Sequence, residues 1–255
     1  MKATQGTVFR RQEALITYLD RYDYGTVSEL AARFRVSEVT IRRDLLFLEK
    51  KQLIERYYGG VKRIKKSEKM ASKRFGTAAE FPWQRLLPAL SPLLREKKLI
   101  FVGAGQWSRE LIRALADFDL TIVTNDHSAL IDPKAGRALV CLCGGEVESN
   151  STALVGDIAT LAFSKYTADL CLIEASGIDP HEITTATLSE SFVYRRMFQH
   201  TKGEKIIYTE GENIGHARGF MIDRTFMANR LFSNRQLSAI ETAQFSAQGL
   251  QFSLL

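Results

Sequence analysis

The sequence contains few metal-binding side chains and no long apolar segment. Its 255 residues include only three cysteines and four histidines, the cysteines never occur as Cys-x-x-Cys, and the histidines are scattered. We therefore expect no metal site, and we expect the buried, reduced thiols of a cytoplasmic protein. No run of about 18 apolar residues occurs and the N-terminus lacks an apolar signal region, so neither membrane insertion nor export is expected.

Acidic residues are scarce in the first 74 residues, which hold 18 Lys and Arg against 9 Asp and Glu, a net charge of +9. The remaining residues hold 17 basic and 20 acidic side chains, hence −3, and the whole chain carries +6. A basic N-terminal module on a mildly acidic body is typical of a nucleic-acid-binding protein. The length allows one large or two ordinary domains, each with a sizeable core.

Two short helices with a tight connection are predicted within the basic module. Residues 28–34 form the first helix. Ser37 is suited to cap the second helix, whose Ile41, Leu45 and Leu48 share one face. This spacing is typical of a helix-turn-helix, in which the second helix enters the major groove of DNA.

A hairpin and a longer N-terminal helix complete the pattern. Residues 53–58 alternate as a strand does, Gly59-Gly60 can form the turn, and residues 61–64 return as a second strand. We also expect a helix at 8–22, and a short strand at Thr26-Val27 that pairs with this wing. The combination predicts a winged helix-turn-helix over residues 1–62, rather than an ordinary amphipathic helix, and hence a double-stranded DNA operator as partner.

The exposed face of the second helix and the hairpin supply the candidate DNA contacts. Val39 and Arg43 are expected at base edges, because a methyl group suits thymine and a guanidinium suits guanine. Thr40 and Arg42 can reach base or phosphate, and the hairpin side chains can reach the DNA backbone. The full predicted set is Ser37, Glu38, Val39, Thr40, Arg42, Arg43, Arg56, Tyr57 and Lys62.

A basic linker is predicted at residues 63–80. It either follows the phosphate backbone or serves as a solvated tether, and both alternatives stay open. The second domain is expected to span residues 81–255. Within it, Pro88 and Pro92 are expected to interrupt a helix between residues 83 and 95.

Short apolar strands alternate with helices throughout the second domain. The expected strands are 99–102, 120–123, 138–143, 170–173, 205–208 and 250–255, and the expected helices are 108–116, one from near 128, 153–165, 190–201 and 236–248. This alternation predicts an α/β fold with a parallel sheet covered on both faces, whose ligands bind beyond the carboxyl ends of the strands. Gly103-x-Gly105 precedes a helix, but the third glycine of the dinucleotide pattern is absent, so no cofactor is expected.

Residues 10–61 closely resemble the N-terminal domain of the DeoR family of bacterial transcriptional regulators. The resemblance is carried by Val27, Leu30-Ala31, Phe34, Val36-Ser37, the run Thr40 to Leu45, Leu48-Glu49, Arg56 and Gly59-Gly60-Val61. It implies a sequence-specific regulator, usually a repressor, with a metabolite-sensing domain behind it. Such proteins usually act as symmetric oligomers, so a homodimer or homotetramer is expected.

The second half resembles, more loosely, the sensor domain of the same family. The matching residues are Thr124-Asn125, Gly144-Gly145, Gly156, Asp169, Gly177-Ile178-Asp179, Thr184-Thr185, Glu190 and Met197. That sensor domain is similar in fold to sugar-phosphate isomerases and usually senses phosphorylated sugars. The resemblance, together with the loops at the strand ends, predicts an effector site made of Gly103, Gly105, Gln106, Trp107, Asn125, Asp126, Gly145, Gly177, Thr184, Thr185, Glu190, Arg195 and Glu210.

Three departures from the family pattern remove features that favour phosphate. The run Gly103 to Trp107 replaces Asp-x-Gly-Thr-Thr, Glu210 to Asn213 replaces Asp-x-x-Lys, and Glu182-Ile183 replaces a glycine. A phosphate buried beside these glutamates would be costly unless Arg195 or Arg218 turned inward. We therefore hypothesise a neutral or cationic effector, or a remodelled site without a ligand.

Two side chains could give such a site its preference. In this hypothesis Trp107 stacks on a sugar ring or base, and Gln106 bonds to hydroxyl groups.

The favoured function is a repressor of a carbohydrate or related catabolic operon, controlled by a small metabolite, and two alternatives are weighed against it. In an isomerase-like enzyme with a DNA-binding appendage, Glu174, Asp179, Glu190 and His127 could do acid–base chemistry. No paired constellation with obvious spacing occurs, so we assign no catalytic residue. An architectural DNA-binding protein would show no effect of ligands on its affinity.

Overall fold

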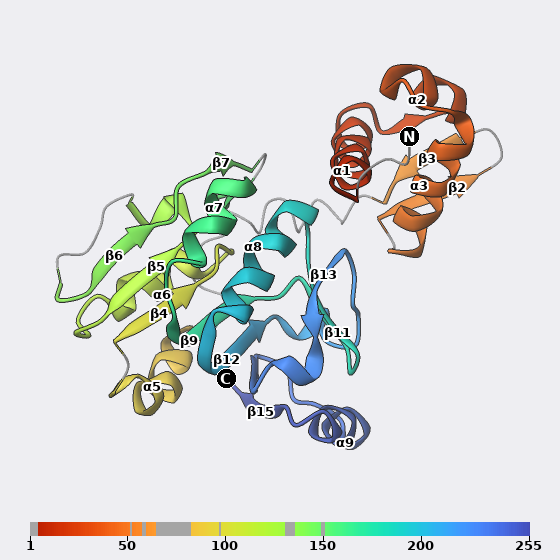
Figure 1. The fold of residues 1–255 in the computed structure, drawn as a ribbon. Coiled ribbons are helices and arrows are strands. Elements are labelled where there is room, and N and C mark those ends of the chain that lie inside the picture. Colours follow the sequence, from red (N-terminus) through yellow and green to blue (C-terminus); the bar gives the residue numbers. More distant parts are fainter. Residues whose placement is uncertain are drawn as a thin grey trace.

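The computed structural model describes residues 5–51, 53–57, 60–64, 83–96, 98–130, 136–148 and 151–255. A small helical domain with a three-stranded sheet precedes a larger α/β domain (Figure 1). This confirms the predicted architecture. Almost all of the predicted basic linker, and Gly59 of the predicted hairpin turn, lie outside the described residues.

The N-terminal domain is a winged helix-turn-helix. Its elements are α1 (Gln5–Tyr22), β1 (Tyr24–Gly25), α2 (Val27–Phe34), α3 (Glu38–Lys50), β2 (Ile54–Tyr57) and β3 (Gly60–Arg63). The three strands pair antiparallel in the order β1-β3-β2.

The short strand lies two residues earlier than predicted, because Thr26 caps α2 instead of pairing with the wing. Its hydroxyl accepts a hydrogen bond from the Glu29 N–H (3.3 Å), and the Glu29 carboxylate accepts one from the Thr26 N–H (2.9 Å). This reciprocal arrangement is a capping box, which satisfies N–H groups that a helix start otherwise leaves free.

A buried carboxylate joins the first helix to the third. Asp44 of α3 is 1% exposed, and it accepts hydrogen bonds from Arg11 Nε (2.5 Å) and Gln12 Nε2 (3.1 Å) of α1. Around it lies an apolar core to which all three helices contribute, including Leu19, Leu30 and other leucines of α1 and α3. The polar contact fixes the direction in which the third helix points relative to the first.

The α/β domain is built on a seven-stranded sheet in which every pair of neighbours is parallel. The order is β15-β14-β12-β9-β4-β5-β6. These strands are β4 (Leu99–Val102), β5 (Thr121–Thr124), β6 (Leu139–Leu142), β9 (Ala168–Glu174), β12 (Thr201–Thr209), β14 (Arg230–Ser233) and β15 (Gln251–Leu254). The six predicted strands are all present, and β14 is an additional strand that was not predicted.

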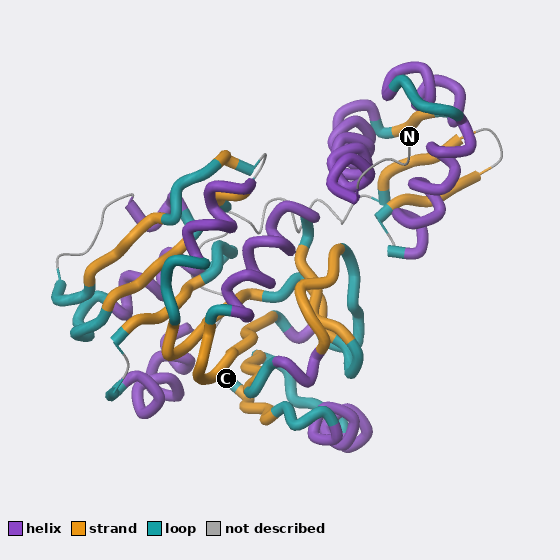
Figure 2. The backbone as a smooth tube through the Cα atoms, in the orientation of Figure 1, coloured by secondary structure: helices purple, strands orange, loops and turns teal. Residues whose placement is uncertain are grey.

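Helices cover both faces of this sheet, as predicted (Figure 2). One apolar cluster packs α7 (Gly156–Phe163) and α8 (Leu188–Gln199) on one face, and a second packs α5 (Trp83–Leu94) and α6 (Ser108–Leu115) on the other. The last helix is α9 (Ala239–Ala247), and single turns of 3-10 helix occur as η1 (His127–Leu130), η2 (Gly211–Asn213) and η3 (Thr225–Met227).

Two further pairings were not predicted. A small antiparallel sheet of β10 (Gly177–Ile178), β11 (Glu182–Thr185) and β13 (Phe220–Arg224) flanks α8, and β7 (Glu146–Val147) pairs with β8 (Leu154–Val155). The helix predicted from residue 153 consequently starts at Gly156, after β8. Of the helix predicted from near residue 128, the described residues form the turn η1, and residues 131–135 lie outside the described part of the chain.

The expectation that two prolines interrupt the helix at 83–95 was wrong. Helix α5 continues through Pro88 and Pro92. Each proline removes one backbone donor, but Leu86, Leu90 and Leu94 recur every fourth residue and are fully buried against the sheet. The burial of this apolar stripe outweighs the loss of two hydrogen bonds.

The first prediction concerns Asp44. Asp44→Ala should lower the stability of the N-terminal domain by about 3 kcal/mol, because it leaves the Arg11 guanidinium largely buried without its partner. The matched control is Glu38→Ala, whose Arg42 partner is exposed, and it should cost about 1 kcal/mol or less. Urea unfolding followed by helical circular dichroism measures both, and equal losses would contradict a structural role for Asp44.

Candidate nucleic-acid interface and effector site

Helix α3 is held so that one side faces the core and the other faces solvent. The Ser37 hydroxyl caps it by accepting a hydrogen bond from the Thr40 N–H (3.2 Å). Ile41, Leu45 and Leu48 are buried, as the sequence predicted. On the opposite side Val39 is 66% exposed, and Arg42 and Arg43 are exposed as well.

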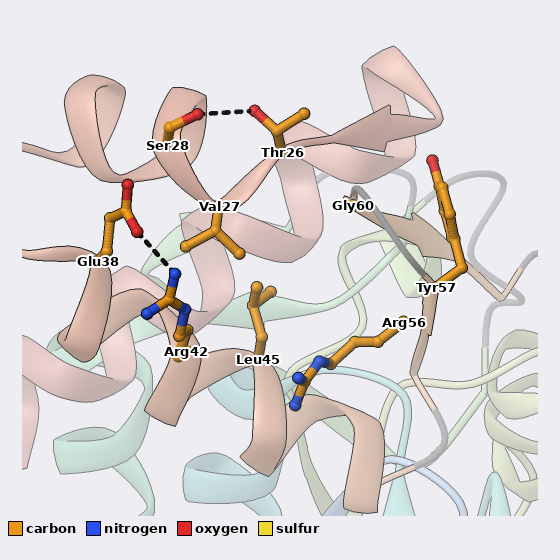
Figure 3. Close-up of a pocket in the computed structure, with 9 residues that line it drawn as sticks. All are labelled: Thr26, Val27, Ser28, Glu38, Arg42, Leu45, Arg56, Tyr57 and Gly60. Carbon is orange, nitrogen blue, oxygen red and sulfur yellow. Dashed lines mark hydrogen bonds and ion pairs between the residues drawn. The ribbon is translucent and has the colours of Figure 1, made fainter.

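A shallow hollow of about 330 Å³ separates α3 from the start of α2 and from the wing. Figure 3 shows Arg42 and Arg56 on two sides of it, with Tyr57 at the rim. The sequence predicted Glu38, Arg42, Arg56 and Tyr57 of its nine lining residues. It missed Thr26, Val27, Ser28, Leu45 and Gly60, although the capping pattern of Thr26 and Glu29 places the start of α2 nearby.

At Gly60, the wing formed by β2 and β3 packs closely against β1. A Cβ atom on Gly60 would lie 2.9 Å from the carbonyl oxygen of Gly25, so a larger residue would push β3 away from β1. This close pairing holds the hairpin whose Tyr57 lines the hollow beside α3, the predicted recognition helix, and whose Lys62 is exposed on β3.

Three cations of this surface are paired with neighbouring acids. Arg42 lies 2.8 Å from Glu38, Arg56 lies 3.5 Å from Glu49, and Lys62 lies 3.0 Å from Glu55. All of these side chains are at least one-third exposed, and such pairs contribute at most about 1 kcal/mol each. A DNA phosphate can therefore replace the acid at little cost.

The loops at the carboxyl ends of β4 and β5 are joined by buried polar contacts. The Ala104 N–H donates to Asn125 Oδ1 (2.8 Å), and the Asn125 amide donates to the Leu154 carbonyl (3.1 Å). The Ser108 hydroxyl donates to the Asp126 carboxylate. Asn125 and Asp126 are fully buried and hold the loops together, so a ligand would meet a preformed edge.

Glu174 explains the Gly-x-Gly pattern after β4. A Cβ atom on Gly105 would lie 2.4 Å from Glu174 Oε2, and the same carboxylate oxygen accepts a hydrogen bond from the Trp107 N–H (3.2 Å). Gly103 is likewise tight against the Tyr194 ring. The glycines thus allow a close approach of the loop to acidic and aromatic side chains.

Trp107 lies in the apolar core. Its side chain is 2% exposed and belongs to the cluster that packs α5 and α6 on the sheet, so its ring cannot stack on a ligand in this conformation. Gln106, beside it, is half-buried.

A second cluster of polar side chains lies around the start of α8. Glu190 is 6% exposed, and its carboxylate accepts hydrogen bonds from Thr185 Oγ1 (2.7 Å) and Ser151 Oγ (3.1 Å). Thr184 donates to the carbonyl of Gly177 (3.1 Å), which fixes β10 against β11. Gly145, at the end of β6, is exposed, and Glu210 follows β12 at the same edge of the sheet.

Arg195 does not face this polar group. Its Nε donates to the carbonyl of Ile222 (2.9 Å) and its terminal nitrogen to that of Met221 (2.7 Å), so its cationic head fixes β13.

Tyr194, which the sequence reasoning missed, lies between the two groups. Burial, and next the nearby Glu190 carboxylate, raise the pKa of Tyr194 well above its ordinary value. The phenol therefore stays protonated and donates to the carbonyl of Ala104 (2.7 Å). Burial also raises the pKa of Cys143 and Cys171 to about 12, so neither thiol is reactive at neutral pH.

Two sequence families match the two domains. The DeoR-like helix-turn-helix domain matches residues 11–67, and the DeoR C terminal sensor domain matches residues 88–234, more than half of the chain. The chain belongs to the DeoR family. It is a DNA-binding transcriptional regulator with a C-terminal sensor domain, as the resemblance implied.

Curated relatives of this DeoR-family regulator are similar over about three-quarters of its length. The HTH-type transcriptional regulator GolR of Listeria innocua is 28% identical over 197 residues, covering 76% of this chain and 78% of GolR. The lactose phosphotransferase system repressor of Staphylococcus aureus is 24% identical over 208 residues, covering 75% and 78%. The HTH-type transcriptional repressor GlcR of Bacillus subtilis is 26% identical over 196 residues, covering 75% and 75%. Within the described residues of the DeoR-family chain, no helix is long and apolar enough to cross a lipid bilayer.

The second prediction separates base contacts from phosphate contacts in this DeoR-family regulator. Arg43→Ala should cost about 1–3 kcal/mol on the preferred operator and should relax the preference at one base pair. Lys62→Ala should weaken binding about equally on all duplexes and lower the salt dependence by about one unit of slope. Fluorescence anisotropy with duplexes selected from a random pool measures both, and a uniform loss for Arg43→Ala would reassign it to phosphate.

The third prediction concerns Trp107. Because its ring fills the core, Trp107→Ala should destabilise the sensor domain by about 3–5 kcal/mol. Thermal unfolding tests this. Gln106→Ala, a change at the half-buried neighbour, should cost about 1 kcal/mol or less. If Trp107→Ala is as stable as Gln106→Ala, the Trp107 ring does not fill the core and is again a candidate for contact with a ligand.

Proposed function

We propose that this regulator is a repressor of a carbohydrate-related operon, and that a small metabolite at the carboxyl edge of its sensor sheet controls its hold on the operator. The names of two relatives support repression, and that of the Staphylococcus aureus protein, a lactose phosphotransferase system repressor, supports a link to carbohydrates. An enzyme is the less supported alternative, because the named relatives are regulators. A homodimer or homotetramer on repeated half-sites is the proposed working form.

The observation that carries this proposal is a contact between the DNA-binding domain and the start of α8. The Glu13 carboxylate of α1 accepts hydrogen bonds from the N–H of Ser189 (2.9 Å) and from its hydroxyl. Leu188 and Phe220 of the sensor domain are buried in the apolar core of the DNA-binding domain. The two domains therefore share polar and apolar contacts.

A second contact holds the end of the recognition helix. Lys51 follows α3, and its ammonium lies 3.1 Å from the Glu182 carboxylate of β11. Its carbonyl accepts a hydrogen bond from the Gly219 N–H (3.3 Å), just before β13. The docked face carries Glu13 and Lys51, whereas Val39 and Arg43 remain exposed and free to meet DNA.

These contacts adjoin the polar group that is the candidate effector site. Ser189 directly precedes Glu190, and Thr185 ends β11, the strand that bears Glu182. A ligand that bonds to Glu190 or Thr185 must alter the hydrogen bonds these two side chains share, and thereby bias the start of α8. In an oligomer this would change the spacing of the recognition helices.

The proposed effector is neutral or cationic, such as a sugar, a polyol or an amino sugar. Asp126, Glu174 and Glu190 all lie at the ends of strands or the start of α8, where they would repel phosphate. Of the two arginines that could offset this charge, Arg195 is bonded to backbone carbonyls of β13 and Arg218 is exposed. Carboxylates readily accept hydrogen bonds from hydroxyl or ammonium groups.

Thermal unfolding of the full chain with a panel of compounds tests the ligand class. The panel contains sugar phosphates, the corresponding free sugars, polyols, amino sugars and nucleosides. A ligand at 100 times its dissociation constant adds about 2.7 kcal/mol to the native state, which is a readable shift. Stabilisation by a sugar phosphate and by no uncharged or cationic compound would overturn the proposed class and leave the repressor function standing.

The fourth prediction tests the contact between domains. Glu13→Ala should leave the affinity for a selected operator within about threefold of the wild-type value, because Glu13 lies away from the exposed side of α3 that bears Val39 and Arg43. It should reduce the change in affinity caused by a compound that stabilises the protein in the panel. The matched control on the same helix is Asp20→Ala, which breaks a pair between the exposed Asp20 and the largely buried Arg63 inside the DNA-binding domain. A full response in Glu13→Ala would show that the signal takes another route.

A further inference from the structure

An apolar strip on α7 faces solvent. Ile158 and Leu161 are 67% and 59% exposed, whereas Ala159 and Phe163 of the same helix are buried against the sheet. Val147 of β7, which lies beside α7 (Figure 1), is 66% exposed. Single exposed apolar residues are ordinary, but three large ones on neighbouring elements are typical of a contact surface.

Opposite charges flank this strip. Asp157 lies at the amino end of α7 and Lys165 just beyond its carboxyl end, and both are exposed. Each is four residues from Leu161. At about 100° per residue, Asp157, Ile158 and Leu161 fall within about one third of the helix circumference, and Lys165 lies in the turn that follows the helix. The exposed face of α7 is therefore acidic at one end, apolar in the middle and basic at the other end.

We infer that α7 is the contact between two copies of this chain, packed antiparallel about a two-fold axis at Leu161. In that arrangement Asp157 of each subunit faces Lys165 of the partner subunit, because each residue is four positions from Leu161 on the axis. The Ile158 and Leu161 side chains of both subunits fill the space between the charged pairs. The surface is thus complementary to itself, as a two-fold contact requires.

The charges alone have another explanation, which does not extend to the apolar residues. An acid at the amino end and a base at the carboxyl end also stabilise the helix dipole of a monomer. The dipole gives no reason to expose Ile158 and Leu161 between them. A copy of the same helix covers those side chains and pairs both charges, so it accounts for the whole pattern.

The contact must extend beyond α7, because eight residues supply less than the roughly 800 Å² per partner that stable interfaces bury. The hairpin next to the helix provides the extension. Its Val147 continues the apolar strip, and Glu146 is the side chain nearest to Gly156, the first residue of α7. Glu146 would thus add a second acid close to Lys165 of the partner subunit.

This inference deepens the proposed repressor, which needs two recognition helices, and its test requires neither DNA nor effector. The mass of the full chain is measured by sedimentation equilibrium over a concentration series. The wild-type chain should be a dimer or a higher even oligomer. A wild-type monomer at all concentrations would overturn the inference, whereas binding of the dimer to no DNA sequence would count against the repressor alone.

Leu161→Glu is the decisive variant. It removes two apolar side chains from the axis and sets two carboxylates against each other, so the dissociation constant of the α7 contact should rise about a hundredfold or more. The matched control is Ile240→Glu on α9, an apolar residue that is 72% exposed, and it should leave the mass unchanged. An unchanged far-UV circular dichroism spectrum of both variants verifies folding, because loss of association alone can lower the melting temperature. An unchanged mass for Leu161→Glu would overturn the inference.

A charge exchange tests the antiparallel register. Asp157→Lys alone, or Lys165→Asp alone, sets like charges against each other across the axis and should weaken association about tenfold. The double variant restores opposite charges at both positions and should recover most of the loss. If the loss of association free energy in the double variant equals the sum of the losses in the single variants, the two residues do not face each other and the register is wrong.

Discussion

The buried carboxylate of Asp44 is the interaction on which the arrangement of this regulator depends. It holds α1 through Arg11 and Gln12, and the next residue of α1, Glu13, bonds to the start of α8. A single helix turn of α1 therefore touches the recognition helix on one side and the sensor domain on the other. Because both contacts are hydrogen bonds to a carboxylate, they fix direction as well as distance. The recognition helix thus has a defined orientation relative to the sensor sheet.

The sensor edge combines buried acidic side chains with one arginine, Arg195, that already has other partners. Asp126 and Glu190 are buried and accept hydrogen bonds from hydroxyl groups, while Arg195 is bonded to two backbone carbonyls. A carboxylate that shares hydroxyl donors is suited to exchange them for the hydroxyls of a ligand. The resemblance to the family implied a sensor of phosphorylated sugars. In this chain the same edge of the sheet carries carboxylates, which repel a phosphate. Specificity within this fold is set by a few loop side chains.

The sequence predicted the elements that depend on local patterns and missed those that depend on distant contacts. Capping at Ser37 and the apolar face of α3 followed from spacing alone, and the parallel sheet followed from alternation. The continuity of α5 through Pro88 and Pro92 depends on packing that spacing does not reveal. The burial of Trp107 and the bonds of Arg195 to backbone carbonyls depend on residues far away in sequence, so the directions of these side chains could not be predicted from their positions. The sequence placed both residues near the site but could not say which way they point.

The exposed ion pairs on α3 and the wing have a consequence for how this protein finds its operator. Arg42, Arg56 and Lys62 each carry a nearby acid of their own, so the face is less positive than its count of cations suggests. Contact with random DNA through phosphates alone must displace these internal partners, which lowers the binding free energy by up to about 1 kcal/mol per pair. Encounters with incorrect sequences are therefore brief. The association rate with DNA is lower, but the search for the operator is shorter, because the protein spends less time bound to non-specific sites.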